Sequence, residues 1–192
     1  IEINPWLSRK GSLDKPDFMI FDIDPAGVKF PIVVDVAKAL YELLESIGIS
    51  SVIKTSGKRG LHLYTNLAGK YSHEESRNFA EAIAKLMEAK FPKLISLERS
   101  PAKRKNKIYI DYLQNRQGQT TASVYSCRPT KFASVSTPLE ISELNAKLDP
   151  TEFTIMNTLE RIEKKGDLWG GLFENEVNLR EVLKKLQIRK SL

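Results

Sequence analysis

Apolar and polar residues alternate over short runs in the first third of the chain, and this alternation is typical of β-strands that bury one face. The run at 18–24 (FMIFDID) predicts a strand, and so do those at 50–56 (SSVIKTS) and 60–67 (GLHLYTNL). The last two are separated only by a turn that contains Gly-Lys-Arg-Gly. We therefore expect them to pair as a hairpin.

Two longer segments have a helical period instead. Apolar residues recur every three or four positions over 31–47, which begins with a proline and is followed by Gly48. The segment 72–91 has the spacing of a capping box, with Ser72 three residues before Glu75, and a proline follows its end. Both segments are predicted to be helices with one buried face.

The second half of the chain is less regular. The runs 107–113 (KIYIDYL) and 120–126 (TTASVYS) predict two more strands, and apolar spacing predicts a helical part from about 150 to 192. The order is strand, helix, two strands, helix, two strands and then helices. This order favours an α+β fold with a mixed or antiparallel sheet in a single domain, 1–192.

Three aspartates occupy positions where a strand would otherwise carry apolar residues. Asp22 and Asp24 alternate with buried positions, so they point to the same face, and Asp111 repeats the arrangement in the later strand. An exposed, solvated acidic face would explain the same pattern. If the two strands are neighbours, the carboxylates converge and suit two divalent cations and phosphoryl transfer.

The hairpin turn KTSGKRGLH has the composition of an anion site. Gly57 and Gly60 allow backbone N–H groups to approach an anion, and His62 begins the returning strand, from which it could donate to a phosphate oxygen. Further donors come from Ser56, Lys58 and Arg59. The other histidine, His73, begins a helix and is expected at the surface.

Polar residues also mark the ends of the two later strands. Gln114, Asn115 and Arg128 stand where the sugar and phosphates of a nucleotide could be reached. Cys127 has no histidine or acid near it in sequence, and we interpret it as a buried or bystander thiol.

The charge is uneven. The net charge is +6, and residues 99–131 contain eight Lys or Arg against one acid. A solvated loop is one interpretation of this zone, and a nucleic-acid or triphosphate contact through Lys103, Arg104 and Lys105 is the other. No apolar run is long enough to cross a membrane, a single cysteine favours an intracellular, cytoplasmic location, and neither a P-loop nor GxGxxG occurs.

Five motifs, taken in order, resemble a known family. The stretches IEINPW, FDIDP, IKTSGKRGLH, IDYLQN and VYSCRPT…VSTPLEISEL have the order and spacing of the polymerase domain of DNA ligase D. That domain belongs to the archaeo-eukaryotic primase superfamily, and the resemblance continues to GDLW at 166–169.

The resemblance implies a primase-type catalytic module on an RRM-like sheet. By resemblance, Asp22, Asp24 and Asp111 would hold two Mn²⁺ or Mg²⁺ ions. The residues that would line the incoming nucleotide are Asn4, Ser56, Arg59, His62, Gln114 and Arg128. The implied activity is template-dependent nucleotidyl transfer from NTP or dNTP to broken or gapped DNA ends in non-homologous end joining, in the nucleoid region and beside Ku and a ligase.

Two departures from the family pattern keep alternatives open. Asn4 replaces a histidine that lies near the nucleotide in the family, and an asparagine cannot carry a charge. The upstream module of the family is also absent from the sequence. The sequence is therefore expected to be a fragment, a partner of a separate N-terminal polypeptide, or a protein without that module. A non-catalytic DNA-binding scaffold and a metal-dependent nuclease remain the alternative functions.

Overall fold

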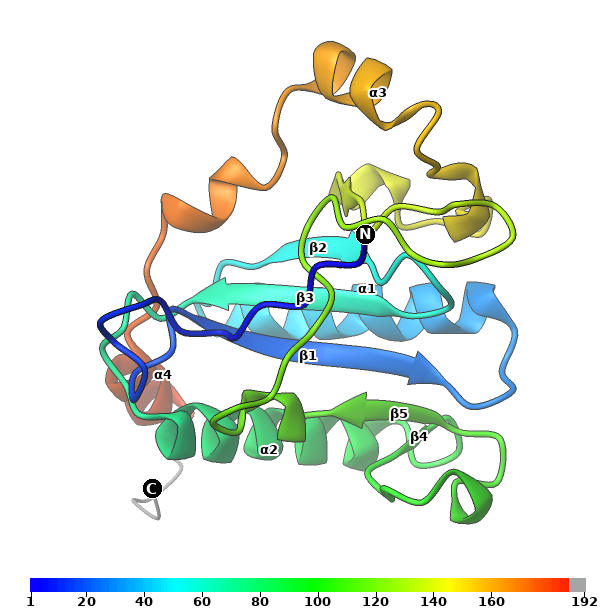
Figure 1. The fold of residues 1–192 in the computed structure, drawn as a ribbon. Helices are drawn as coiled ribbons and strands as arrows, with labels where there is room; N and C mark the ends of the chain where they lie inside the picture. Colours follow the sequence, from blue (N-terminus) through cyan, green and yellow to red (C-terminus); the bar gives the residue numbers. More distant parts are fainter. Residues whose placement is uncertain (187–192) are drawn as a thin grey trace.

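The computed structural model describes residues 1–186 and shows the predicted α+β fold (Figure 1). The strands are β1 (Phe18–Pro25), β2 (Val52–Thr55), β3 (Leu61–Asn66), β4 (Ile95–Ser96), β5 (Ile108–Asp111) and β6 (Pro138–Leu139). The helices are α1 (Phe30–Ser46), α2 (His73–Lys90), α3 (Thr158–Lys165) and α4 (Leu179–Lys185). The end of the predicted C-terminal helical part, 187–192, lies outside the described residues.

One sheet contains all six strands in the order β4-β5-β1-β3-β2-β6. The pairs on either side of β1 are antiparallel, as is the predicted β2–β3 hairpin, whereas the short β4 runs parallel to β5. The sheet is therefore mixed. The strands that carry the predicted aspartates, β1 and β5, are neighbours.

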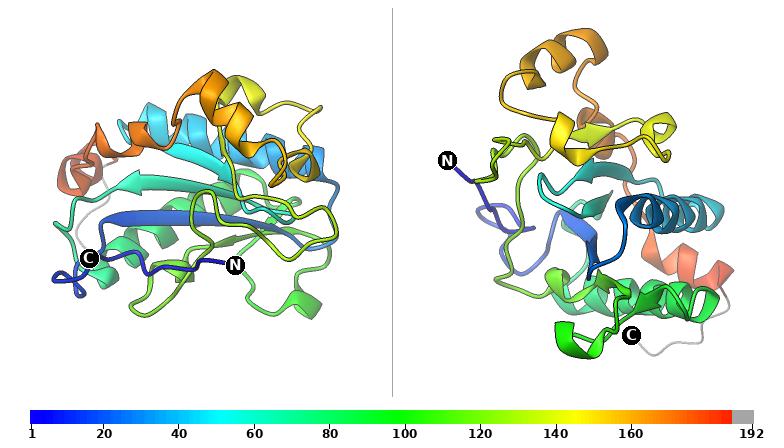
Figure 2. Two further views of the ribbon diagram at one scale, coloured as in Figure 1. Left: turned by 45° about the horizontal axis from the view of Figure 1, so that its top comes forward. Right: turned by 90° about the vertical axis from the view of Figure 1, so that its right-hand side faces the viewer.

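Helices α1, α2 and α4 pack on one face of this sheet, and the N-terminal segment and the loop after β5 pass over the other (Figures 1 and 2). The main core lies between the helices and the sheet, where Phe21, Ile23 and Leu63 are fully buried. A smaller cluster on the opposite face contains Ile20 and Tyr64. Alternate residues of β1 thus serve the two faces, as its sequence predicts.

Helix α2 begins where the capping box places it. The Ser72 side chain accepts a hydrogen bond from the Glu75 N–H, and the Glu75 carboxylate accepts one from the Ser72 N–H. His73 follows this cap and is buried, not at the surface as expected. Its two ring nitrogens lie 3.1 Å from the carbonyl oxygens of Leu13 and Asn115, so the ring joins two loops to the helix.

The predicted strand at 120–126 is wrong. The structure shows an irregular segment there with one bridge, between Thr120 and Trp6, and a hydrogen bond from the Ser123 N–H to the Ile3 carbonyl. Tyr125 has φ +58°, which an extended strand does not permit. This segment consequently lies against the N-terminal residues and forms part of a loop over the sheet.

No helix within residues 1–186 is long and apolar enough to cross a membrane.

Candidate active site

A row of four polar side chains crosses the middle of the sheet, one from each of four neighbouring strands. In the strand register, Asp22 of β1 stands opposite Asp111 of β5 on one side and His62 of β3 on the other. Lys54 of β2 stands opposite His62. Directly opposed residues point to the same face, so the row lies on the face away from α1 and α2.

The charges in this row act on one another at short range. Asp22 Oδ1 lies 3.4 Å from His62 Nε2. Burial works to raise the pKa of Asp22, but His62, Lys54 and Arg128 together outweigh it and lower that pKa. Burial lowers the pKa of His62, and the neighbouring Lys54 charge lowers it further. The surroundings thus favour the carboxylate form of Asp22 and the neutral form of His62.

The pKa of Asp111 is shifted in the opposite direction. Burial and the nearby charge of Asp22 raise its pKa, although its Oδ1 accepts hydrogen bonds from the Leu113 N–H at 2.9 Å and the Tyr109 hydroxyl at 3.2 Å. Two carboxylates on adjacent strands therefore repel each other. A hard cation between them would relieve this repulsion, because carboxylate oxygens are the ligands that Mg²⁺ and Mn²⁺ prefer.

The third predicted ligand, Asp24, lies one row further along β1, opposite Tyr109. Its side chain is half exposed, and its Oδ2 accepts a hydrogen bond from Arg104 at 3.3 Å. Arg104 itself is buried and stacks on the Tyr109 ring at 3.9 Å. Within residues 1–186, no three His, Cys, Asp or Glu side chains are gathered closely enough to hold a metal ion as they stand.

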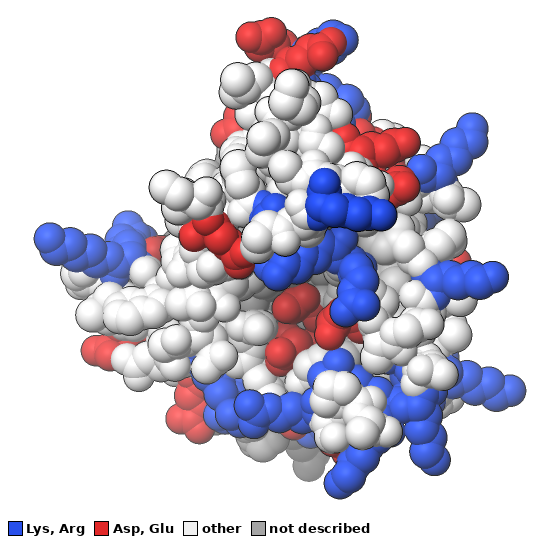
Figure 3. All heavy atoms as spheres, turned by 45° about the vertical axis from the view of Figure 1, so that its right-hand side comes forward, with Lys and Arg blue, Asp and Glu red and all other residues white. Residues whose placement is uncertain are grey.

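The three predicted DNA-binding residues of the basic zone do not all point toward solvent. Arg104 faces inward, toward Asp24, whereas Lys103 and Lys105 are exposed on either side of it. Figure 3 shows acidic atoms at the bottom of a hollow that Lys and Arg side chains border. The border of this hollow, here called the basic rim, is positively charged, and the bottom of the hollow is negatively charged.

A cavity of about 300 Å³ opens beside the row of polar side chains. The six predicted nucleotide-binding residues all line it: Asn4, Ser56, Arg59, His62, Gln114 and Arg128. Asp22 and Asp24 complete one wall, and Thr120, Thr121 and Ala122 complete another. Residues from four separate parts of the sequence thus meet at one site.

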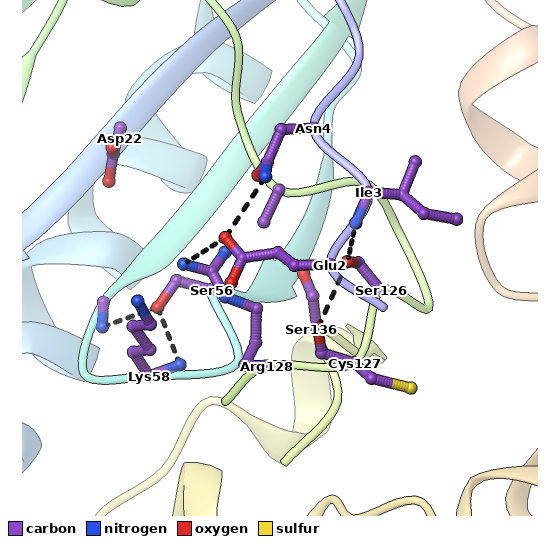
Figure 4. A network of polar contacts seen from close by, with 12 residues as sticks. Glu2, Ile3, Asn4, Asp22, Ser56, Lys58, Ser126, Cys127, Arg128 and Ser136 are labelled. Atoms are coloured by element: carbon purple, nitrogen blue, oxygen red, sulfur yellow. Dashed lines mark hydrogen bonds and ion pairs between the residues drawn. The ribbon is translucent and has the colours of Figure 1, made fainter. Parts of the chain in front are cut away.

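The turn between β2 and β3 also lines the cavity, through Ser56, Lys58, Arg59 and Gly60. Ser56 Oγ accepts hydrogen bonds from the N–H groups of Lys58, at 3.2 Å, and Gly60, at 3.0 Å (Figure 4). Contrary to expectation, these two N–H groups are therefore engaged within the turn. Gly57 has φ +72°, and a Cβ there would lie 2.5 Å from Arg128 Cγ. Only glycine allows this close approach.

A short polar chain at the N-terminus supports Arg128. Asn4 Nδ2 donates to Glu2 Oε1 at 3.2 Å, and the same oxygen lies 3.4 Å from the Arg128 guanidinium (Figure 4). Arg128 Nε is buried without a hydrogen-bond partner, as is Gln114 Oε1. Since buried polar groups are almost always paired, two unpaired ones in the lining of one cavity indicate a place for a polar ligand.

Comparison with known proteins is decisive for the family. Residues 1–169 match the LigD primase-polymerase domain. The chain belongs to this family. It is 37% identical to the bifunctional non-homologous end joining protein LigD of Bacillus subtilis over 79% of this chain, and 28% identical to the Pseudomonas aeruginosa LigD over 85%. It spans only 25% and 20% of those two proteins.

A solved LigD structure has the same fold. The polymerase domain of Mycobacterium tuberculosis ligase D, in complex with DNA, superimposes with a TM-score of 0.78 and 31% identity. The match covers 85% of this chain and 57% of that one. The recognition of the family from its ordered motifs is thereby confirmed, as is the α+β sheet flanked by helices.

One central residue of this LigD primase-polymerase chain was missed by the sequence analysis. Lys54 is fully buried and lies 3.0 Å from His62 Nδ1. Its position in the run Val-Ile-Lys-Thr supplied a signal, because alternation places it on the same face as its partner in the hairpin.

Asp111, Asn115 and Cys127 are not in the lining of the cavity of this LigD family member. The Asn115 side chain is buried and bonds to the N–H and carbonyl of Ile20, so it fastens the loop after β5 to β1. Cys127 is half-buried and unbonded to another cysteine, which fits a bystander thiol.

Proposed function

We propose that this chain is the nucleotidyl-transfer module of an end-joining polymerase, and that its cavity binds the triphosphate and sugar of an incoming nucleotide. One observation carries the proposal: Asp22 lines a cavity together with cationic and amide groups, and a second carboxylate, Asp111, stands directly opposite it on the neighbouring strand. Two of the polar atoms in that lining are buried without partners. Phosphate oxygens would pair with Arg128 Nε, and a ribose hydroxyl would pair with Gln114 Oε1.

The donor set fits divalent cations. Asp22, Asp111 and Asp24 would hold Mn²⁺ or Mg²⁺ through carboxylate oxygens. When bound, such ions lower the pKa of an attacking hydroxyl and stabilise the charge that develops on a leaving pyrophosphate. Asp24 is engaged with Arg104 in the free protein, so a bound cation would compete with that guanidinium for its carboxylate.

The remaining groups hold and orient the nucleotide. His62, Arg59 and Arg128 supply hydrogen-bond donors on the side of the triphosphate, and Ser56 fixes the turn that carries Arg59. Asn4 orients Glu2, and through it Arg128, so the residue that replaces the family histidine acts here by position without a charge. The exposed Lys103 and Lys105 would contact DNA phosphates.

The test is primer extension on a gapped or 5′-overhanging duplex with Mn²⁺ and each class of nucleotide. We expect extension by the wild-type protein and its loss in the near-isosteric variants Asp22→Asn and Asp111→Asn. The same variants should keep their affinity for DNA, which depends on the basic rim. Products shorter than the primer would indicate the nuclease, and DNA binding without extension in any of the proteins would indicate the scaffold.

A further inference from the structure

The ammonium of Lys54 is placed where lysines are rarely found. The side chain is fully buried in β2, and three groups surround its Nζ: His62 Nδ1 at 3.0 Å, the Ala122 carbonyl at 2.9 Å and Ser136 Oγ at 2.6 Å. None of the ion pairs formed within residues 1–186 includes Lys54. Its neighbours are therefore hydrogen-bond partners, and their chemistry fixes the direction of each bond.

Two of the three bonds have a single possible direction. A carbonyl oxygen only accepts, so Nζ donates to Ala122. The Ser136 hydroxyl donates its one proton to the Thr55 carbonyl at 2.7 Å, so it accepts from Nζ. An ammonium has three N–H donors and no lone pair, and its third N–H is directed at His62 Nδ1.

While Lys54 is an ammonium, this third bond determines where the imidazole carries its proton. A nitrogen that accepts from an ammonium must present its lone pair, so Nδ1 is unprotonated and the proton resides on Nε2. Nε2 is the nitrogen on the side of Asp22, and His62 lines the cavity. The opposite tautomer would turn a lone pair toward the carboxylate and a proton toward the ammonium.

The same ammonium also joins two parts of the cavity wall. Ala122 belongs to the lining segment that follows Thr121, and Ser136 packs on Gly57 in the turn that carries Arg59. Lys54 bonds to Ala122, to Ser136 and to His62. It therefore holds the imidazole, the turn and the loop over the sheet in place relative to one another.

We propose that Lys54 is a positioning residue for nucleotide binding: it holds His62 in the Nε2-protonated tautomer, with that N–H available to an anionic oxygen in the cavity. The part concerning nucleotide rests on the function proposed above, whereas the tautomer is a property of the free protein. The two can therefore fail separately.

Asp22 on the other side of the ring favours the same tautomer, so the test must remove its influence. Burial lowers the pKa of Lys54 to about 7, and spectra are therefore recorded at pH 6, where the side chain is an ammonium. Long-range ¹H–¹⁵N correlation reports which imidazole nitrogen is protonated. The chain has two histidines, and a His62→Gln variant assigns the signals.

We expect His62 to be Nε2-protonated in the wild-type protein and to remain so in Asp22→Asn, where Lys54 alone holds it. In Asp22→Asn/Lys54→Met, the two tautomers should average. A change of tautomer in the single variant, or an unchanged one in the double variant, overturns the proposal. If the double variant does not fold, the single variant still decides.

Nucleotide binding supplies the second readout. At pH 6, where Lys54 is an ammonium, Lys54→Met should weaken ATP binding in the presence of Mn²⁺ roughly tenfold to hundredfold, as expected when a hydrogen bond to a charged group is misdirected. The control is Lys38→Met, an exposed lysine on α1, which should bind as the wild type does. Unchanged affinity in folded Lys54→Met overturns the positioning role. A wild-type protein that shows the expected tautomer but binds no ATP contradicts the proposed function instead.

Discussion

Lys54 predicts how the stability of this protein changes with pH. Burial lowers the pKa of its ammonium from 10.5 to about 7, against the opposing attraction of Asp22 and with a contribution from Arg128. In the unfolded chain the pKa returns to its ordinary value. Between about pH 7 and 10.5 the unfolded state consequently binds more protons than the folded state, so the contribution of Lys54 to stability must rise with pH over this interval.

The size of the effect follows from the same two values. Each unit of difference in pKa corresponds to about 1.4 kcal/mol, so the whole interval is worth ~5 kcal/mol. Within the range convenient for measurement, half of the folded molecules are already deprotonated at pH 7, and the gain from pH 7 to pH 9 is therefore about 2 kcal/mol. Below pH 6 both states are protonated, and the contribution is constant.

The assay is urea unfolding of the wild type and Lys54→Met from pH 5 to pH 9. The free energy of unfolding of the wild type, minus that of the variant, should be flat below pH 6 and then rise by about 2 kcal/mol between pH 7 and pH 9. Taking the difference removes the titration of groups that Lys54 does not influence. The same difference calculated for Lys38→Met should show no such rise. A difference that is constant across the range would refute a depressed pKa for this buried lysine.

Three further predictions concern the scaffold. A Cβ added at Gly57 would lie 2.5 Å from Arg128 Cγ, so Gly57→Ala should lower the free energy of unfolding by more than about 2 kcal/mol. Gly118→Ala, also at positive φ but in open space, should cost only about 1 kcal/mol. Burial works to raise the pKa of Glu143, but the hydrogen bond from Arg161 outweighs it and lowers that pKa to about 2. The stability that this carboxylate contributes is therefore present above pH 4.5 and declines toward pH 2, and urea unfolding of Glu143→Gln should show a loss of about 1–2 kcal/mol at pH 7 that shrinks below pH 4.5. Ser72→Ala should lower the unfolding free energy by about 1 kcal/mol, measured by thermal denaturation, because it removes the cap of α2.

Local patterns made much of the fold predictable. The alternation in β1 placed Asp22 and Asp24 on one face, and the capping box located the start of α2 to the residue. Both signals act over a few residues, where backbone geometry determines which side chains are neighbours. The cavity was predictable to the same degree, since its six expected residues occur in motifs whose order resembles the LigD family.

Contacts between distant segments were not predictable in this way. The bond between Asp24 and Arg104, and the burial of His73 between two loops, depend on how strands and loops assemble. The segment 120–126 has the composition of a strand, yet it forms only one β-bridge with the N-terminal residues beside it, between Thr120 and Trp6. Strand propensity describes the fit to a partner, and no partner can be identified from the segment alone.

The row of polar residues also constrains how the strands can pair. Side chains alternate between the faces of a sheet, so a slip of one residue in the register of β1 would exchange all of them. Phe21 and Ile23 would then enter the cavity, and Asp22 would be driven between the sheet and the helices, where an unpaired carboxylate is very costly.

Incorrect pairings of the central strand are thus penalised twice, by lost apolar burial and by buried charge. The neighbouring strands contribute to the same selection, because Lys54 and His62 would meet the same penalty if the hairpin slipped. The charged residues that weaken the native sheet therefore exclude its nearest misfolded competitors. Replacing them with apolar residues should increase stability while allowing the chain to populate more than one register.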